Sequence, residues 1–304
     1  MEKIKPIKVT KDMRVSEIVN EMKGAGFGAR KIGQASEIMK KMFLNPNCTI
    51  FLGVAGAMVP AGMKDILIDM IKEDKIDVFV TTGANLTHDL AEALGEFHYS
   101  CDIWDDVDFS KKGFDRIHNV FMKNTTYEKI EGFFEENWEK FQNCKDITSF
   151  LEKIGELLPE KGNNLLRTCY EKKIPVFCPG ISDSGIGLMV WGRLASGKTL
   201  NIDVFEDMKK IIDISWNSKK KGVIYIGGGV PKNFIQQSLQ VSTGADYGIQ
   251  ITVDRPEPGG SSGAPLEEGI SWGKLKSDAK KNQDYVDVFC DATIAIPLLW
   301  ASVK

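Results

Sequence analysis

Apolar residues recur at helical spacing near the start of the chain and later form short, nearly continuous runs. From Val15 to Phe43 the spacing predicts two helices, separated by the glycines between Gly24 and Gly28. The later runs are typical of buried strands. They are "TIFLGVAG" (49–56), "IDVFVTTGA" (76–84), "IPVFCPG" (174–180), "GVIYIGGGV" (222–230), "DYGIQIT" (246–252) and "VDVFCDATIAIPLL" (286–299).

Helical patterns lie between most of these predicted strands, as at 204–215 and 231–240. Strands that alternate with helices favour a mostly parallel sheet covered on both faces. The fold class expected is therefore α/β, doubly wound and Rossmann-like. We expect one domain over 1–304, with a helical N-terminal region at 1–45 and a helical insertion at 99–173, where charged residues, Phe and Trp are frequent.

Composition excludes several classes of protein. The net charge is −3 and no block of Lys and Arg is interleaved with aromatics, so no nucleic-acid partner is expected. No apolar run is long enough to span a membrane, and the first residues lack the apolar core of a signal peptide. The six cysteines form no Cys-x-x-Cys pair, which predicts reduced thiols in a cytoplasmic protein. No ligand spacing indicates a metal.

Small residues follow several predicted strands. The segments read "GVAGAMVPAG", "TTGANLTHD", "CPGISDSGIG" and "IGGGVPKN". Ligands of open α/β sheets bind outside the carboxyl ends of the strands, and amides that begin a helix can hold phosphate oxygens. These loops therefore indicate a dinucleotide, although glycine-rich turns also occur in α/β proteins without one. The earlier "GAGFGA" follows a helix instead of a strand, so it does not predict a dinucleotide site.

The long segment "DRPEPGGSSGAPLEEGISWGKLKSDAK" contains a candidate nucleophile, Lys274. Long irregular loops in compact domains are usually functional or disordered. A lysine becomes nucleophilic when its surroundings lower its pKa, and Trp272 can supply an apolar wall. Lys274 can equally be a solvated surface lysine and Trp272 a core aromatic. The residues alone leave both readings open.

Segments across nearly the whole chain resemble the deoxyhypusine synthase family. They are "GFGARKIGQASEI", "FLGVAGAMVPAGMKDIL", "IGGGVPK", "GADYGIQIT", "VDRPEPGGSSGAPLEEGISWGKLKSDA" and "FCDATIAIPLL". The resemblance implies that NAD oxidises spermidine and that a lysine captures the aminobutyl group as an imine. An acceptor amine then takes the group before hydride returns.

The resemblance also assigns roles to residues. Lys274 matches the imine-forming lysine, Trp272 would line the polyamine channel and Glu268 would hold an ammonium group. Gly259, Gly260 and Ser261 would border that site. Cofactor contacts would fall on Gly56, Ala57, Met58, Val59, Pro60, Thr82, Gly83, Asp183, Gly228, Asp291 and Ala292. The family also implies a homotetramer.

This chain departs from the family pattern where a polyamine would bind. Thr87 and His88 stand where the family has two glutamates, and Leu188 replaces an aspartate. Asn233 stands in the place of the proposed general-base histidine, and an asparagine cannot accept a proton near neutral pH. His88 is a candidate replacement base, although a structural hydrogen bond explains it equally well.

Three functions follow from the resemblance. The first is aminobutyl transfer to a lysine of the translation factor 5A precursor. The second keeps the chemistry but uses a free diamine as acceptor, which makes homospermidine. The third is a non-catalytic relative that keeps the NAD site. The missing carboxylates change which polyamine can bind, because an ammonium group that loses its hydration in the site needs a countercharge.

Overall fold

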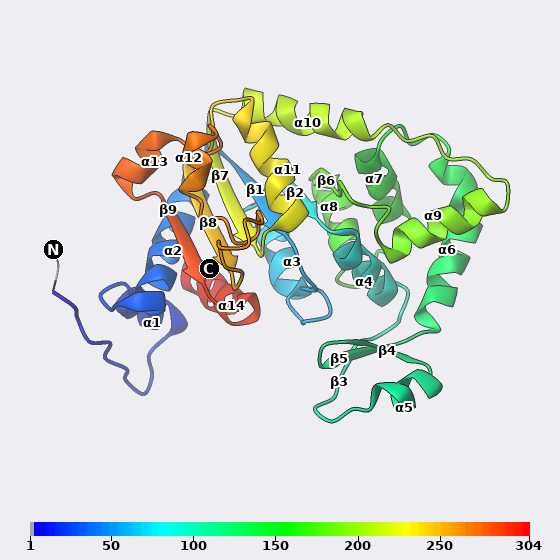
Figure 1. The fold of residues 1–304 in the computed structure, drawn as a ribbon, viewed down its shortest axis with the longest axis horizontal. Coiled ribbons are helices and arrows are strands. Elements are labelled where there is room, and N and C mark those ends of the chain that lie inside the picture. Colours follow the sequence, from blue (N-terminus) through cyan, green and yellow to red (C-terminus); the bar gives the residue numbers. More distant parts are fainter. Residues whose placement is uncertain (1–2) are drawn as a thin grey trace. The chain divides into compact units, whose positions relative to one another are not determined.

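The computed structural model describes residues 3–304 and divides them into two compact units. The first unit contains 3–55, 75–80 and 208–304, and the second contains 56–74 and 81–207. The sequence analysis treats the chain as one domain. The two units are described separately below, with the labels of Figure 1.

A mostly parallel sheet forms the centre of the first unit (Figure 1). Its strand order is β6-β2-β1-β7-β8-β9, in which the two-residue β6 belongs to the second unit. The strands are β1 (Cys48–Val54), β2 (Val78–Thr81), β6 (Val176–Phe177), β7 (Lys220–Ile226), β8 (Tyr247–Thr252) and β9 (Tyr285–Phe289). These strands and the helices around them confirm the predicted α/β class.

One register row shows why the sheet ends at a common edge. Val54 pairs with Ile226, Ile226 with Ile251, and Ile251 with Val288, all in parallel. All four side chains are buried, as expected for strands covered on both faces. The segments that follow these strands therefore begin at the same edge, as the sequence analysis predicted.

Helices complete the first unit. They are α1 (Val15–Met22), α2 (Phe27–Phe43), α10 (Val204–Asn217), α11 (Gly229–Gln240), α12 (Glu268–Ser271), α13 (Ser277–Asn282) and α14 (Ala292–Val303), of which α10 begins in the second unit. The predicted pair of helices near the N-terminus is confirmed. A Cβ on Gly33 would lie 2.6 Å from the Lys23 nitrogen, so the glycine lets α2 approach the end of α1 closely.

The last predicted strand, 286–299, is wrong in its second half. The strand β9 ends at Phe289, and α14 begins at Ala292. The Asp291 carboxylate accepts hydrogen bonds from the Thr293 nitrogen and hydroxyl, both at 2.7 Å, and so caps the helix. A buried helix and a buried strand give the same continuous apolar run, so periodicity alone could not separate them.

The second unit is largely helical. Its helices are α3 (Lys64–Lys72), α4 (Gly83–Ala93), α5 (Asp106–Lys111), α6 (Thr126–Phe141), α7 (Ile147–Leu157), α8 (Leu165–Lys172) and α9 (Gly185–Ala195). Within 99–173, where the sequence predicted helices, the structure also forms a three-stranded antiparallel sheet, β3-β5-β4. Its strands are β3 (Tyr99–Ser100), β4 (Phe114–Ile117) and β5 (Val120–Lys123). A cluster of Phe109, Phe114 and Phe121 packs within this region.

Within residues 3–304, no helix combines the length and apolar character needed to cross a membrane. The six cysteines of the described chain are free thiols.

Candidate functional site

The start of α11 lies against the long loop after β8. Gly227 and Gly229 adopt φ values of +73° and +55°, which favour glycine. A Cβ on Gly228 would lie 2.2 Å from the Ser262 Cα, so only glycine permits this approach. The Ser261 hydroxyl donates to the Gly229 carbonyl at 3.3 Å. The predicted residues Gly228 and Ser261 therefore belong to one packed arrangement.

A buried lysine holds this loop in place. Lys232 is 1% exposed, and its ammonium donates to Gln250 Oε1 at 2.7 Å and to the Ser261 and Ala264 carbonyls at 2.8 and 2.6 Å. Burial lowers the pKa of Lys232 to about 8, with Lys274 acting in the same direction and Asp287 and Glu268 opposing it. The loop conformation therefore depends on one internal cation.

The candidate nucleophile lies in a turn fixed at both ends. The Lys274 nitrogen donates to the Gly269 carbonyl at 2.8 Å, and the Lys274 carbonyl accepts from the Ala245 nitrogen at 3.0 Å. The half-buried side chain places its ammonium 5.1 Å from the centre of the Trp272 ring. Two backbone hydrogen bonds thus fix the position of Lys274, although the residue is in neither a helix nor a strand.

The Trp272 ring, which the sequence suggested as an apolar wall, faces the Lys274 amine and is itself 55% exposed. As for any lysine, the Lys274 amine must pass its proton to another group before it can attack a carbon.

The neighbouring residues Glu267 and Glu268 differ in their hydrogen bonds and ion pairs. Glu267 pairs with Lys280 and accepts from the Tyr285 hydroxyl at 2.9 Å, and these hydrogen bonds lower the pKa of its carboxyl group. The Glu268 carboxylate is exposed and has no ion pair or hydrogen bond within 3–304. Glu268 is therefore available to an external ammonium, whereas Glu267 is engaged.

The remaining predicted residues of this unit lie on the same loops. Gly259 has φ +76°, and a Cβ on either Gly259 or Gly260 would meet nothing within 4 Å. Asn233, the fifth residue of α11, is half-buried. Asp291 is exposed, and the hydrogen bond from Thr293 lowers its pKa. Asp291 and Ala292 begin α14, as Gly228 begins α11.

The starts of α11 and α14 have features that suit part of a dinucleotide. Free amides at the start of a helix suit a phosphate, and an exposed ionised carboxylate such as Asp291 suits the hydroxyls of a ribose. The glycines at 227–229 present backbone without side chains in the way. These features of the first unit are compatible with NAD.

In the second unit, Asn85 organises the predicted cofactor loop. Asn85 Oδ1 accepts from the Val59 nitrogen at 3.3 Å, and its amide donates to Thr81 Oγ1 at 3.3 Å. Thr82 caps α4 by accepting from the Asn85 nitrogen. The bonds hold the loop that contains Gly56, Ala57, Met58, Val59 and Pro60 against the start of α4.

The starts of α4 and α9 lie side by side within the second unit. A Cβ on Gly83 would lie 2.4 Å from the Ser184 Cβ, so packing explains this glycine. Asp183 comes directly before the α9 cap and is exposed. Leu188, one turn into α9, is 55% exposed. At this position, where the resemblance implies an aspartate, the chain therefore presents an apolar side chain to the surface.

Thr87 is structural in this chain. It is 3% exposed, donates to the Gly83 carbonyl at 2.8 Å and accepts from the Ile186 nitrogen at 3.2 Å. A Cβ on Gly185 would lie 2.5 Å from the Thr87 methyl carbon, so the space beside Thr87 is filled. The glutamate that the resemblance implies at this position would thus have no room here.

We expect Thr87→Glu, which introduces the residue that the resemblance implies, to lower the free energy of unfolding by about 3 kcal/mol or more. The change overpacks the α4–α9 contact and buries a carboxylate without a countercharge. Urea unfolding of the purified variant measures this. Thr87→Ser, which keeps the hydroxyl, should lose less than about 1.5 kcal/mol, and an equal loss in both variants would contradict the argument.

His88 is half-buried and forms a pair with His98. His88 Nδ1 lies 2.9 Å from His98 Nε2, and His98 Nδ1 lies 2.7 Å from Glu92 Oε1. Burial, together with the neighbouring His98, lowers the pKa of His88 to about 4, although Glu92 opposes this. His88 is therefore a neutral imidazole at pH 7.

The depressed pKa of His88 predicts a loss of stability in acid. Between its ordinary pKa near 6.5 and about 4, the unfolded chain binds a proton that the folded chain does not. Stability from this group is thus complete above pH 6.5 and falls as the pH decreases toward 4. We expect the wild type to lose about 2 kcal/mol more than His88→Asn between pH 7 and 4.5, by urea unfolding. Equal losses would contradict this.

The structure groups the predicted residues into two sets, one in each unit. The first set contains Asn233, Gly228, Gly259, Gly260, Ser261, Glu268, Trp272, Lys274, Asp291 and Ala292, and the second contains Gly56, Ala57, Met58, Val59, Pro60, Thr82, Gly83, His88 and Asp183. The sequence analysis named neither Lys232 nor Glu92 and gave His98 no role in the site. Lys232 carried a signal, because it lies three residues after the last glycine of "GGGVPK".

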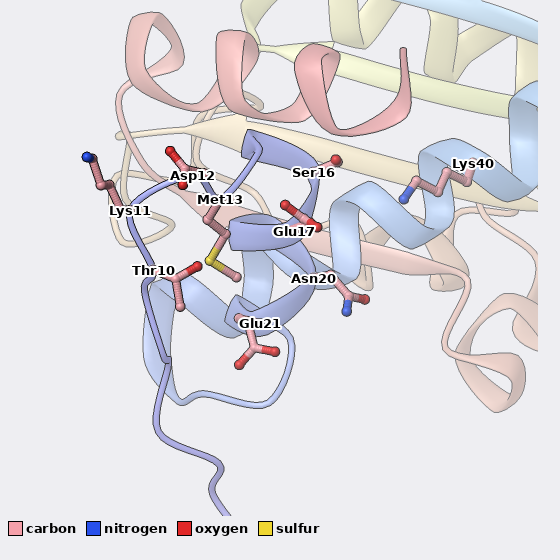
Figure 2. Close-up of a pocket in the computed structure, with 9 residues that line it drawn as sticks. All are labelled: Thr10, Lys11, Asp12, Met13, Ser16, Glu17, Asn20, Glu21 and Lys40. Carbon is pink, nitrogen blue, oxygen red and sulfur yellow. The ribbon is translucent and has the colours of Figure 1, made fainter.

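A separate pocket of about 640 Å³ lies in the first unit near the N-terminal segment (Figure 2). Its lining comes from 10–13, from α1 and from α2. The residues are Thr10, Lys11, Asp12, Met13, Ser16, Glu17, Asn20, Glu21 and Lys40. It contains none of the predicted site residues.

Comparisons with known proteins identify the family. A family model described as "Deoxyhypusine synthase" matches residues 17–303. "Probable deoxyhypusine synthase 1" of Methanosarcina mazei is 40% identical over 99% of this chain and 94% of its own length. The protein of the same name from Archaeoglobus fulgidus is 41% identical over 96% of this chain and 95% of its own length.

A solved structure shares the fold. The "putative deoxyhypusine synthase" of Entamoeba histolytica superposes with a TM-score of 0.64 at 18% identity, over 96% of this chain and 93% of that one. This similarity supports the α/β fold, and the closer sequence relatives establish the family. The chain with Lys274 in its Ser-Trp-Gly-Lys turn belongs to the deoxyhypusine synthase family, transferases that take an aminobutyl group from spermidine.

Proposed function

We propose that this protein transfers an aminobutyl group from spermidine or a related polyamine, with NAD as cofactor and Lys274 as the covalent carrier. The observation that carries the proposal is the turn that presents Lys274 over Trp272. Among the described residues, no hydrogen bond or ion pair engages the Lys274 amine. Glu268, six residues earlier, offers an unengaged carboxylate for a substrate ammonium.

The chemistry divides between cofactor and chain. NAD, when bound, would take a hydride from the carbon beside the secondary amine of the donor and return it at the end. Lys274 Nζ, as a free amine, attacks that carbon, diaminopropane leaves with the other nitrogen, and the four-carbon group stays on Lys274 as an imine. Glu268 and the Trp272 face hold the donor's ammonium groups during this exchange.

The acceptor we propose is a lysine of the translation factor 5A precursor. A second candidate, a free diamine, is favoured by the altered polyamine residues. The Thr87 hydroxyl is hydrogen-bonded within the protein, and Leu188 presents an apolar surface where the resemblance implies an aspartate. Fewer carboxylates change which amines the site can hold, and this changed specificity is the reason to test a free diamine as acceptor.

Covalent trapping tests the proposal. The purified protein is incubated with NAD and spermidine, reduced with borohydride and digested, and the peptides are analysed by mass spectrometry. We expect an added aminobutyl group on Lys274. An unmodified Lys274 in a protein that binds NAD would instead favour a non-catalytic relative.

The acceptor is tested by competition. Radiolabelled spermidine is supplied with the translation factor 5A precursor, with putrescine, or with both. Label in the precursor protein supports the first candidate, and label in homospermidine supports the second. Light scattering of the same sample tests the homotetramer that the family leads us to expect.

A further inference from the structure

A pocket of about 500 Å³ lies entirely within the second unit, where the start of α3 meets the segment that leads into α8. The helices α3 and α8 pack against each other. The lining includes Gly62, Lys64 and Asp65 from the α3 segment, and it includes Lys161 and Asn164 from the α8 segment. A cavity of this size can hold a small organic molecule.

One side chain of this pocket is buried but has no partner. Asn164 is 3% exposed, and within residues 3–304 its side-chain amide makes no hydrogen bond. Neither polar atom of the amide is among the sealed atoms of the described chain, so the amide is open. Since Asn164 lines the pocket, its small exposed surface faces the pocket. A buried amide without a hydrogen bond costs about 1 to 3 kcal/mol, which a bound ligand would recover.

The fold leaves this amide free. Asparagine is a preferred N-cap residue, and Asn164 comes directly before α8. The capping role is taken by Asp89 of α4, whose carboxylate accepts from the Leu165 and Leu166 nitrogens at 2.8 and 3.1 Å. Asn164 therefore does not bond back to its own helix. A Cβ on Gly162 would lie 3.4 Å from Asn164 Nδ2, so the glycine leaves this side of the amide uncovered.

The start of α3 borders the same pocket and is not capped. No side chain accepts a hydrogen bond from its first turn, and the N-cap residue is Met63. In the part of the chain that the structure describes, the backbone nitrogens of Lys64, Asp65 and Ile66 donate to no acceptor. Free amides at the start of a helix attract oxyanions. This helix start and the Asn164 amide are independent features that suit the same kind of ligand.

The charges of the lining leave one cation unengaged. Lys64 pairs with Glu92, and Asp65 Oδ1 accepts from Asn163 Nδ2 at 3.2 Å. Lys161 is exposed and, among residues 3–304, makes no ion pair or hydrogen bond. Two lysines and two carboxylates line the pocket, so directed hydrogen bonds decide what binds more than net charge does.

An aromatic side chain completes the pocket. Phe97 belongs to the lining and is 65% exposed. An exposed ring offers apolar area to the flat or apolar part of an organic molecule. The volume is larger than a phosphate ion needs, so an organic group can lie beside the ring.

We propose that this pocket binds an organic phosphate. The phosphate oxygens accept from the free nitrogens at the start of α3, from the Asn164 amide and from the Lys161 ammonium, while the organic part lies against Phe97. The site is separate from the aminobutyl chemistry and does not depend on it. It adjoins the loop expected to contact NAD, because Val59 and Pro60 also line the pocket.

Calorimetric titration of the full-length protein tests the site, with phenyl phosphate as the probe. At low salt we expect a Kd of about 1 mM or tighter. Inorganic phosphate should bind about tenfold more weakly, because it has no group to lie against Phe97. Benzoate, which has the ring but only a carboxylate, should also bind more weakly than phenyl phosphate. No binding of phenyl phosphate at about 20 mM, or equal affinity for benzoate, would overturn the proposal.

Asn164→Asp is the sharpest variant, because it keeps the shape of the side chain but replaces the donor with a negative charge. We expect the Kd for phenyl phosphate to rise about 30-fold or more. Asn201→Asp is the matched control, because it makes the same change at an exposed position outside the lining. It should leave the Kd within about twofold. A wild-type Kd in Asn164→Asp would overturn the proposal.

Lys161→Gln covers the case in which the change at the buried Asn164 disturbs α8. Lys161 is exposed, so its replacement leaves the fold intact. We expect the Kd for phenyl phosphate to rise about threefold to tenfold, whereas Lys111→Gln, at an exposed position of α5, should leave it unchanged. Equal Kd values in the two lysine variants would overturn the proposed phosphate contact.

NAD distinguishes this site from the expected cofactor site. Of the cofactor residues expected in this unit, only Val59 and Pro60 belong to the lining. We therefore expect phenyl phosphate to bind the NAD-saturated protein with a Kd within about threefold of that for the protein alone. Competitive displacement by NAD would overturn the proposal, because the pocket would then be part of the cofactor site. If the protein binds no NAD, the proposed function fails, and the titrations of the variants still decide whether this site exists.

Discussion

Replacement of Lys274 by arginine is expected to abolish aminobutyl transfer, with a fall in kcat of about 10³-fold or more. Arginine keeps the positive charge and can stay over the Trp272 ring, but its guanidinium does not lose a proton in proteins and cannot form the imine. Turnover of labelled spermidine and borohydride trapping measure the effect. NAD binding should be unchanged, because the variant removes only the carrier.

The matched control for this experiment is Lys276→Arg. Lys276 lies two residues further in the same segment and pairs with Asp246 at 2.8 Å, a pairing that arginine can keep. We expect activity within about threefold of the wild type. Adduct formation at more than a tenth of the wild-type rate in Lys274→Arg would show that another group carries the aminobutyl chain.

The alternation of strands and helices could be predicted from the sequence because buried parallel strands are continuous apolar runs bounded by glycine. Residues 286–299 show the limit of this pattern. The aspartate that ends the strand and caps α14 was visible in the sequence, but the apolar run continues across it. The three short strands within 99–123 are partly exposed and form a small sheet with one another, so the local pattern did not reveal them.

Some residues of the candidate site could likewise be predicted from the sequence and others could not. Residues directly after strands could be predicted, because topology brings the carboxyl ends of parallel strands to one edge. Lys232 and His98 could not, because their roles depend on partners 18 to 32 and 6 to 10 residues away in sequence. The exposure of Trp272 also depends on packing that no local pattern specifies.

Thr87 and His88 are neighbours on α4 with different surroundings. Thr87 fills the contact between α4 and α9, while His88 lies 2.9 Å from His98, which in turn contacts Glu92 of α4. Where the family resemblance implies two carboxylates, this chain thus has one structural hydroxyl and one imidazole that is neutral at pH 7. Less negative charge at these positions would change which polyamine binds. We therefore interpret the two positions as altered substrate handling instead of simple loss of the site.

Lys232→Met is expected to lower the free energy of unfolding by about 3 to 5 kcal/mol. Methionine fills much of the volume but leaves the Ser261 and Ala264 carbonyls and Gln250 Oε1 without their shared donor. Urea unfolding measures the loss. At a temperature where the variant stays folded, the rate of adduct formation on Lys274 should also fall by about 10²-fold, because the loop at 259–264 shifts.

Lys221→Met distinguishes this effect from general destabilisation. Lys221 is equally buried at 1% exposure, and its ammonium donates to Thr243 Oγ1 at 2.8 Å and to the Ser215 carbonyl at 3.3 Å. It lies at the start of β7, whereas Lys232 follows the carboxyl end of that strand. We expect Lys221→Met to be destabilised by a similar amount but to keep the wild-type rate of adduct formation while folded. Equal loss of rate in both variants would mean that Lys232 supports the fold alone and does not position the loop for chemistry.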